Sequence, residues 1–181
     1  MITIYSSDSM GVRGNCLYPY RHEVTDAAGL REAVKHDYVC AEYKNSYRSG
    51  GNFITSNCLG MDCDNDHTDH EHEWITPDDV RRNFPDVPLA IHFSRHHMKP
   101  KDQKSSRPRF HCLFAIEPTT DVKAYANMKA RLNALFPYFD AQALDGARFF
   151  FGTDNPEVDF FPGTITLDEC LERYYPEEDS F

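Results

Sequence analysis

The sequence predicts an α/β fold of the α+β type, in which a mixed β-sheet is flanked by helices. Several short segments alternate apolar and polar residues, which is the period of a β-strand, while others space their apolar residues as a helix does. Strand-like and helix-like segments follow one another without an internal repeat or a low-complexity linker. This organisation predicts a single domain over residues 1–181, which could be part of a larger protein.

The first predicted elements are a short helix and two strands. Thr25 or Asp26 can cap a helix over residues 27–36. Residues 38–43 then read as a strand. After a glycine pair, the longest predicted strand covers residues 53–64.

The next helix has the clearest start signal in the chain. Thr76 offers a capping hydroxyl, Pro77 suits the first helical position, and Asp79 completes the pattern of a capping box. This helix is expected to run to about Phe84, before a strand over residues 89–93.

The remaining predicted elements are one strand and two helices. Residues 109–116 alternate as a strand, and Thr119 or Thr120 is expected to cap the longest helix, which runs to Leu135. A short helix is expected near residues 167–174. The order of strands and helices is compatible with a ferredoxin-like or RNA-recognition-like sheet.

Composition limits the class of protein. The chain has 181 residues, of which 40% are hydrophobic, so it can bury a substantial core. It shows neither an apolar run of the roughly 18 residues that span a bilayer nor a signal-peptide pattern, which predicts a cytoplasmic protein without a membrane partner. Its six cysteines are scattered, with no Cys-x-x-Cys pair, and are expected to be reduced core thiols.

The charges are segregated along the chain. The net charge of −10 argues against a nucleic-acid coat protein with a uniformly basic surface. Residues 62–73 carry acidic side chains without Lys or Arg, whereas residues 95–109 are basic apart from Asp102. A metal site beside a phosphate site needs this separation, although each run is also typical of a solvated loop.

The acidic segment begins with a pair of carboxylates. Asp62 and Asp64 lie two residues apart at the end of the long predicted strand. Strand alternation turns both to one face and Met61 and Cys63 to the other. Two anionic oxygen donors of this kind are typical of divalent-metal sites in phosphoryl transfer.

The strand that ends the basic segment has one cationic face. Alternation places Arg107, Arg109 and His111 together, opposite Phe110 and Cys112. Arginine forks suit phosphate oxygens, so these residues are predicted to bind an oxyanion. The preceding residues, 95–106, are expected to form a long polar, basic loop.

A third polar cluster precedes an aromatic strand. Asp140 follows Phe139, Asp145 follows Leu144, and Arg148 comes directly before three phenylalanines. Either Asp140 or Asp145 can supply a third metal carboxylate. Arg148 is a candidate for a phosphate contact, or for an ion pair with Asp145.

These three motifs, in this order, resemble the archaeo-eukaryotic primase (AEP) superfamily, in particular the primase-polymerase (PrimPol) domains of plasmids, phages and mobile elements. The resemblance spans residues 53–152 and rests on Asp62-Cys63-Asp64, on Arg109-Phe110-His111 and on Phe139-Asp140. Arg109 stands where the family usually has Ser or Thr. Asp140 is preferred over Asp145, because relatives often carry a second Asp and an Arg after the metal ligand.

The resemblance implies a function and a set of ligands. Asp62, Asp64 and Asp140 would hold two Mg²⁺ or Mn²⁺ ions, with Asp145 as the alternative ligand. His111, with Arg107, Arg109 and Arg148, would contact the incoming nucleotide. The implied enzyme is a DNA primase or polymerase that joins nucleoside triphosphates on a single-stranded DNA template, with a replicative helicase as a further potential partner.

The residues also allow two other functional hypotheses. His67, His70 and His72 could bind zinc, or could belong to a replication-initiation nickase that uses Tyr125 as its nucleophile. The chain could also be a binding module for single-stranded nucleic acid, which would not need Asp62.

Overall fold

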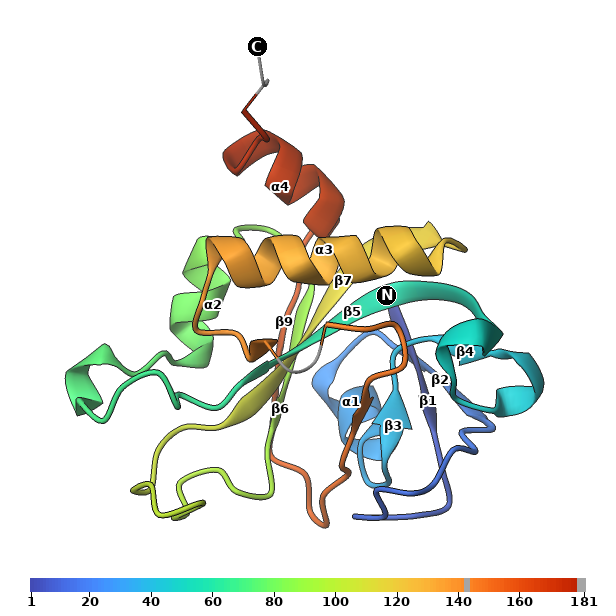
Figure 1. Cartoon of the computed structure of the whole chain (residues 1–181), viewed down its shortest axis with the longest axis horizontal. Coiled ribbons are helices and arrows are strands. Elements are labelled where there is room, and N and C mark those ends of the chain that lie inside the picture. The colour runs from blue at the N-terminus through green and yellow to red at the C-terminus, as the bar shows by residue number, and fades with distance from the viewer. Residues whose placement is uncertain (142–143, 179–181) are drawn as a thin grey trace.

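Two antiparallel sheets form the body of the protein in a computed structural model, which describes residues 1–141 and 144–178 (Figure 1). The first sheet has the order β2-β1-β3-β8 and the second, central sheet the order β4-β5-β7-β6-β9. The strands are β1 (Ile2–Ser6), β2 (Tyr20–Val24), β3 (Tyr38–Val39), β4 (Glu42–Tyr43), β5 (Phe53–Cys63), β6 (Leu89–Phe93), β7 (Phe110–Thr119), β8 (Phe149–Phe150) and β9 (Val158–Phe161). The helices are α1 (Ala27–Ala33), α2 (Pro77–Asn83), α3 (Val122–Leu135) and α4 (Leu167–Tyr174), with short 3₁₀ turns η1 (Lys44–Ser46), η2 (Gly50–Asn52) and η3 (Glu71–Glu73).

The predicted α+β class is confirmed, but the arrangement of the strands differs from a single mixed sheet. Every strand pair in the described part of the chain is antiparallel, and the strands divide between two sheets. The predicted strand over residues 38–43 is the point of division. Its first half pairs with β1 and β8, and its second half pairs with β5.

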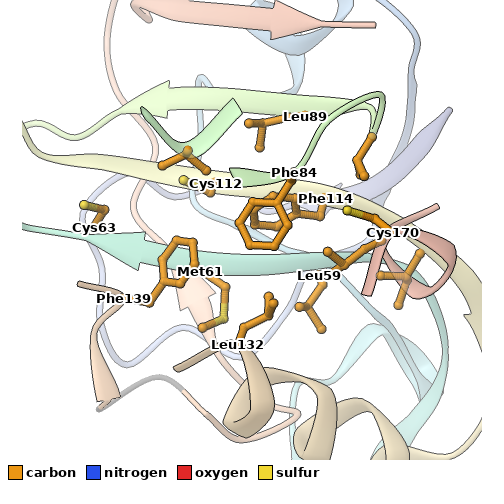
Figure 2. Close-up of a cluster of buried hydrophobic side chains, with 14 of the residues drawn as sticks. Leu59, Met61, Cys63, Phe84, Leu89, Cys112, Phe114, Leu132, Phe139 and Cys170 are labelled. Carbon is orange, nitrogen blue, oxygen red and sulfur yellow. The ribbon is translucent and has the colours of Figure 1, made fainter. Parts of the chain in front are cut away.

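The central sheet is covered on both faces. On one face, Leu59, Met61 and Cys63 of β5 pack with Cys112 and Phe114 of β7 beneath the helices α2, α3 and α4 (Figure 2). On the opposite face, other side chains of the central strands pack against β1, α1 and β3; this second cluster includes Ile2, Ile4, Leu30, Ala90 and Leu113. The protein therefore has three layers, with the central sheet between the helices and the smaller sheet (Figure 1).

Capping side chains determine where the helices begin. Asp26 caps α1 by accepting the Gly29 N–H at 2.8 Å. Thr76 and Asp79 form the predicted capping box of α2. The expectation for α3 was wrong by one or two residues, because Asp121 rather than Thr119 or Thr120 accepts the N–H groups of its first turn.

Two further observations bear on the sequence predictions. All six cysteines are free, and five of them are buried, in agreement with reduced core thiols. Among the described helices, none is both long and apolar enough to cross a membrane.

Candidate active site

Asp62 lies near the end of β5, on the face of the central sheet turned away from helices α2 and α3. Met61 and Cys63 point into the helix-covered core, so the predicted alternation is confirmed for this strand. Asp62 is opposite His111 of β7 in the sheet register, and His111 is opposite His92 of β6. The antiparallel pairing thus brings together motifs that are separated by 49 residues in the sequence.

The Asp62 carboxylate is buried and bound on both oxygens. Its Oδ1 pairs with Nδ1 of His111, and its Oδ2 accepts a hydrogen bond from Nη2 of Arg148 at 2.7 Å. Burial by itself would raise the pKa of Asp62, but the charges and hydrogen bonds of His111 and Arg148 outweigh it and hold the pKa well below its ordinary value. Asp62 is therefore held as an anion, with His111 and Arg148 bound to its two oxygens.

Asp140 is placed beside Asp62 by the backbone. The N–H of Asp140 donates to the carbonyl of Asp62 at 2.9 Å, and the preceding Phe139 is anchored in the helix-covered core (Figure 2). Asp145 is exposed, and its carboxylate accepts the N–H of Ala147 at 2.8 Å. Of the two candidate third carboxylates, Asp140 is the one that lines the cavity described next.

A cavity of about 540 Å³ opens over these residues. Its acidic lining comprises Asp62, Asp64, Asp102 and Asp140; its basic lining comprises Arg13, Arg95, Lys101 and Arg148; and Ser94, His96, His111, Phe149, Phe150 and Phe151 complete it. Carboxylates and cations thus share one hollow, as a site for both a metal and a phosphate group requires.

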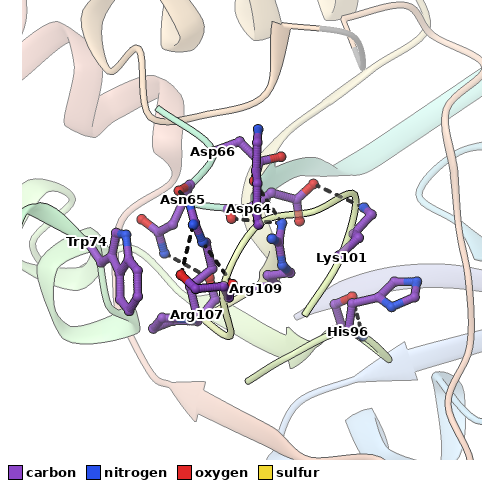
Figure 3. Close-up of polar contacts among 12 residues, drawn as sticks. Asp64, Asn65, Asp66, Trp74, His96, Lys101, Arg107 and Arg109 are labelled. Atoms are coloured by element: carbon purple, nitrogen blue, oxygen red, sulfur yellow. Dashed lines mark hydrogen bonds and ion pairs between the residues drawn. The ribbon is translucent and has the colours of Figure 1, made fainter. Parts of the chain in front are cut away.

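Asp64 reaches the same cavity from just beyond the end of β5. Burial, followed by the nearby charge of Asp62, raises its pKa above the ordinary value, and the charge of Lys101 opposes that shift. Lys101 Nζ lies 3.9 Å from the Asp64 carboxylate (Figure 3). A further positive charge placed between Asp62 and Asp64 would relieve the repulsion between them.

Arg107 lies in contact with the acidic segment and outside the cavity. Its side chain is fully buried, and its guanidinium donates to the carbonyls of Asn65 and Thr68 and to the carboxylate of Asp69. It also lies over the ring of Trp74 (Figure 3). Because its donors are turned into the acidic segment, Arg107 does not line the cavity, and the structure does not bring it together with Asp62 and His111.

Arg109 also contacts the acidic segment, but only through Nη1, since its Nε and Nη2 are buried without a hydrogen-bond partner among the described residues. It is also fully buried, and its Nη1 donates to the carbonyl of Asp64 and to Oδ1 of Asp66, each at 3.0 Å. Lys104 Nζ adds a weaker contact to Asp66 at 3.5 Å. The acidic and basic segments, which the sequence shows as separate runs, therefore pair with each other (Figure 3).

The donor chemistry of the cavity fits a hard divalent cation. Asp62, Asp64 and Asp140 supply carboxylate oxygens, which are the ligands that Mg²⁺ and Mn²⁺ prefer. Across residues 1–141 and 144–178, however, no three His, Cys, Asp or Glu side chains are gathered closely enough to hold an ion as they stand. The ion pairs of Asp62 and Asp64 must rearrange before these residues can form a ligand set.

The structure does not favour a zinc site at the histidines of the acidic segment or a nickase site at Tyr125. His67 lies beside the carbonyl of Glu73, and His70 and His72 are exposed on the acidic segment. Tyr125, the candidate nucleophile of a nickase, is buried, and its hydroxyl donates to the carbonyl of Cys58 at 2.8 Å. A strand of DNA cannot reach that hydroxyl in the folded protein.

Sequence reasoning missed one side of the cavity. Arg13 lines it from the loop after β1, where no strand or motif marks it. The buried carboxylate of Asp37 holds this loop by accepting the N–H groups of Gly11 and Val12, at 2.8 and 2.9 Å. The contact spans more than 20 residues, so no local pattern could reveal it.

Comparison with known proteins identifies the fold. Neither the models of protein families nor the curated proteins include a match to this sequence. Among solved structures, the AEP domain of the cyanophage S-2L primase-polymerase (PrimPol) matches 94% of this chain, over 88% of its own length. The TM-score is 0.50 and the sequence identity 17%. The chain therefore has an AEP-like fold, in agreement with the fold that the sequence resemblance implied.

Proposed function

We propose that this protein is a template-dependent nucleotidyltransferase, a DNA primase or polymerase that joins nucleoside triphosphates on single-stranded DNA. One observation carries the proposal. Asp62, Asp64 and Asp140, which come from two distant segments, meet in one cavity together with His111 and Arg148. The AEP-like fold, shared with a domain of a primase-polymerase, supports the same reaction.

Asp62, Asp64 and Asp140 would hold the divalent cations, Mg²⁺ or Mn²⁺. When bound, these ions neutralise charge on the phosphates and favour ionisation of the attacking hydroxyl. The contribution of the protein is to keep Asp62 ionised, which His111 and Arg148 already do. Burial and the charge of Asp62 raise the pKa of Asp64, so the positive charge of the ions would favour its ionised form.

His111 and Arg148 would have a second role in this proposal. Placed on β7 and beside β8, their N–H groups would donate to phosphate oxygens of a bound nucleotide. Lys101, close to Asp64, is placed for the same role. Since catalysis of phosphoryl transfer is mainly positioning and charge stabilisation, no protein nucleophile is required.

The aromatic wall of the cavity suits the base of the nucleotide. Phe149, Phe150 and Phe151 all contribute to the lining, and Phe150 packs against the ring of His111. Stacking of bases on aromatic side chains is tolerant of sequence, as a template-copying enzyme needs.

Incorporation of labelled nucleotides tests the proposal. The assay uses a single-stranded DNA template with and without a primer, in Mg²⁺ or in Mn²⁺, and compares the wild type with Asp62→Ala and Asp140→Asn. Asp145→Asn is the matched control, because that carboxylate binds a local backbone N–H. We expect each cavity variant to lose at least about 100-fold in rate while remaining folded, and the control to keep its activity.

Two outcomes would overturn the assignment. Equal product from Asp62→Ala and the wild type would exclude the proposed metal site. No product from the folded wild type in either metal, together with binding of single-stranded DNA that does not depend on metal, would favour the alternative of a binding module.

A further inference from the structure

A second, smaller cavity adjoins the candidate active site. It has a volume of about 300 Å³ and is lined by Met10, Gly11, Arg95, Lys99, Gly152, Thr153 and Asp154. Arg95 belongs to the lining of both cavities, so the two hollows meet at its side chain. A ligand that extends from one cavity to the other would therefore pass Arg95.

The guanidinium of Arg95 is held in place before any ligand binds. Its central carbon lies 4.2 Å from the centroid of the Phe151 ring. On another side is Gly11, whose φ of +76° favours glycine and where a Cβ would come within 3.3 Å of Arg95 Nη1. The glycine backbone on one side and the aromatic ring on another orient the guanidinium, so ligand binding costs it little side-chain entropy.

One buried carboxylate ties the walls of the second cavity together. Asp37 accepts the N–H of Gly11 and the N–H of Gly152 on the same oxygen, each at 2.8 Å. These two glycines come from distant segments, and both line the cavity. The cavity is thus a fixed feature of the fold rather than a gap between independent loops.

The charges and apolar surface of this region suit a nucleic-acid strand. Arg95 and Lys99 are exposed, and neither forms an ion pair within the described residues, whereas Arg107 and Arg109 are committed to the acidic segment. Met10 stands about half exposed in the wall. A thioether side chain beside two available cations offers a base an apolar contact next to its phosphates.

We propose that the second cavity holds the backbone of single-stranded DNA as it leaves the active site, with Arg95 and Lys99 binding phosphates and Met10 contacting a base. This inference rests on the proposed function, because it gives the template its path. Asp154 is the acidic residue in the lining and would repel the phosphates of the strand, so removing its charge should strengthen DNA binding.

Fluorescence anisotropy of a labelled single-stranded oligonucleotide, measured over a range of salt concentrations, tests the path. Lys99→Ala should weaken binding about fivefold and make the slope of log K against log salt shallower by about 0.7, the value for one phosphate contact on a single strand. Asp154→Asn should tighten binding. Lys123→Ala is the matched control, since Lys123 is an exposed lysine on α3, which covers the other face of the central sheet.

The outcomes separate this inference from the proposed function. If the wild type incorporates nucleotides but Lys99→Ala keeps the wild-type affinity and salt slope, the path is wrong and the enzyme assignment stands. If the wild type makes no product but Lys99→Ala still loses the contact, the strand site stands and the enzyme assignment fails. In an active enzyme, Lys99→Ala should leave the KM for nucleotide unchanged at saturating template, because Lys99 does not line the main cavity.

Discussion

Replacing Arg107 with Lys tests whether this residue holds the acidic segment or binds nucleotide. The substitution keeps the positive charge but removes the planar fork of donors. If Arg107 is structural, Arg107→Lys should lower stability and leave the KM for nucleotide unchanged. If the sequence-based expectation of a phosphate contact were right, the KM would rise instead.

The magnitude follows from the contacts of the guanidinium. Arg107 makes five hydrogen bonds: to the carbonyl and hydroxyl of Ser105, to the carbonyls of Asn65 and Thr68, and to the carboxylate of Asp69. A lysine ammonium has three donors, so at least two bonds are lost. At about 1.5 kcal/mol for each bond from a charged donor, the cost is about 3 kcal/mol. For a chain of this length, that lowers the Tm by roughly 6–12 °C.

Thermal unfolding followed by circular dichroism gives the Tm, and fluorescence reports the local change. Trp74 is the only tryptophan in the sequence, and its ring lies 5.1 Å from the guanidinium carbon of Arg107. We expect its emission to change in Arg107→Lys at temperatures where the protein is still folded. Arg82→Lys, an exposed arginine on α2, is the matched control and should change stability by less than about 0.5 kcal/mol. A Tm equal to that of the wild type, with a raised KM, would refute the structural role.

Three further predictions concern the surroundings of the site. Burial, and then the charge of His111, lower the pKa of His92, so the unfolded state binds more protons than the folded state. The free energy of unfolding should therefore fall as the pH drops below about 6.5, by up to about 1.4 kcal/mol per pH unit. Urea unfolding at pH 7.5 and pH 5.5 should show a smaller loss for His92→Gln than for the wild type, and equal losses would exclude the effect. Gly60→Ala would place a Cβ 2.7 Å from the ring of Phe150, so we expect a loss of about 1–3 kcal/mol in the free energy of unfolding, and an unchanged value would contradict this packing. Asp37→Ala should cost about 1–3 kcal/mol by removing the acceptor of three N–H groups, of which that of Gly152 is buried, and hydrogen exchange that stays slow at the Gly152 amide would argue against it.

Alternation within the long strands was the most reliable guide from sequence to site. In β5 and β7, a period of two is enough to decide that Asp62 and His111 lie opposite the helix-covered core. Capping patterns likewise locate α2 to the residue. These signals are local, since a strand or a first helical turn is determined by residues within a few positions of one another.

The partners of each side chain were decided by the tertiary structure. Arg107 and Arg109 precede β7, and alternation cannot show that the acidic segment folds over them. For the third carboxylate, the sequence allows Asp140 or Asp145. The hydrogen bond from the Asp140 N–H to the Asp62 carbonyl makes the choice.

The sequence by itself determined the fold class, most of the elements and the residue types of the site. Only the tertiary structure brought Arg13 and Arg95 to the cavity and assigned Arg107 and Arg109 to the acidic segment. The reason is the range of the interactions. Periodicity and capping depend on residues that are near neighbours in the sequence. The strength of a charge pair depends on the distance between the two charges in space, and only the folded structure determines that distance.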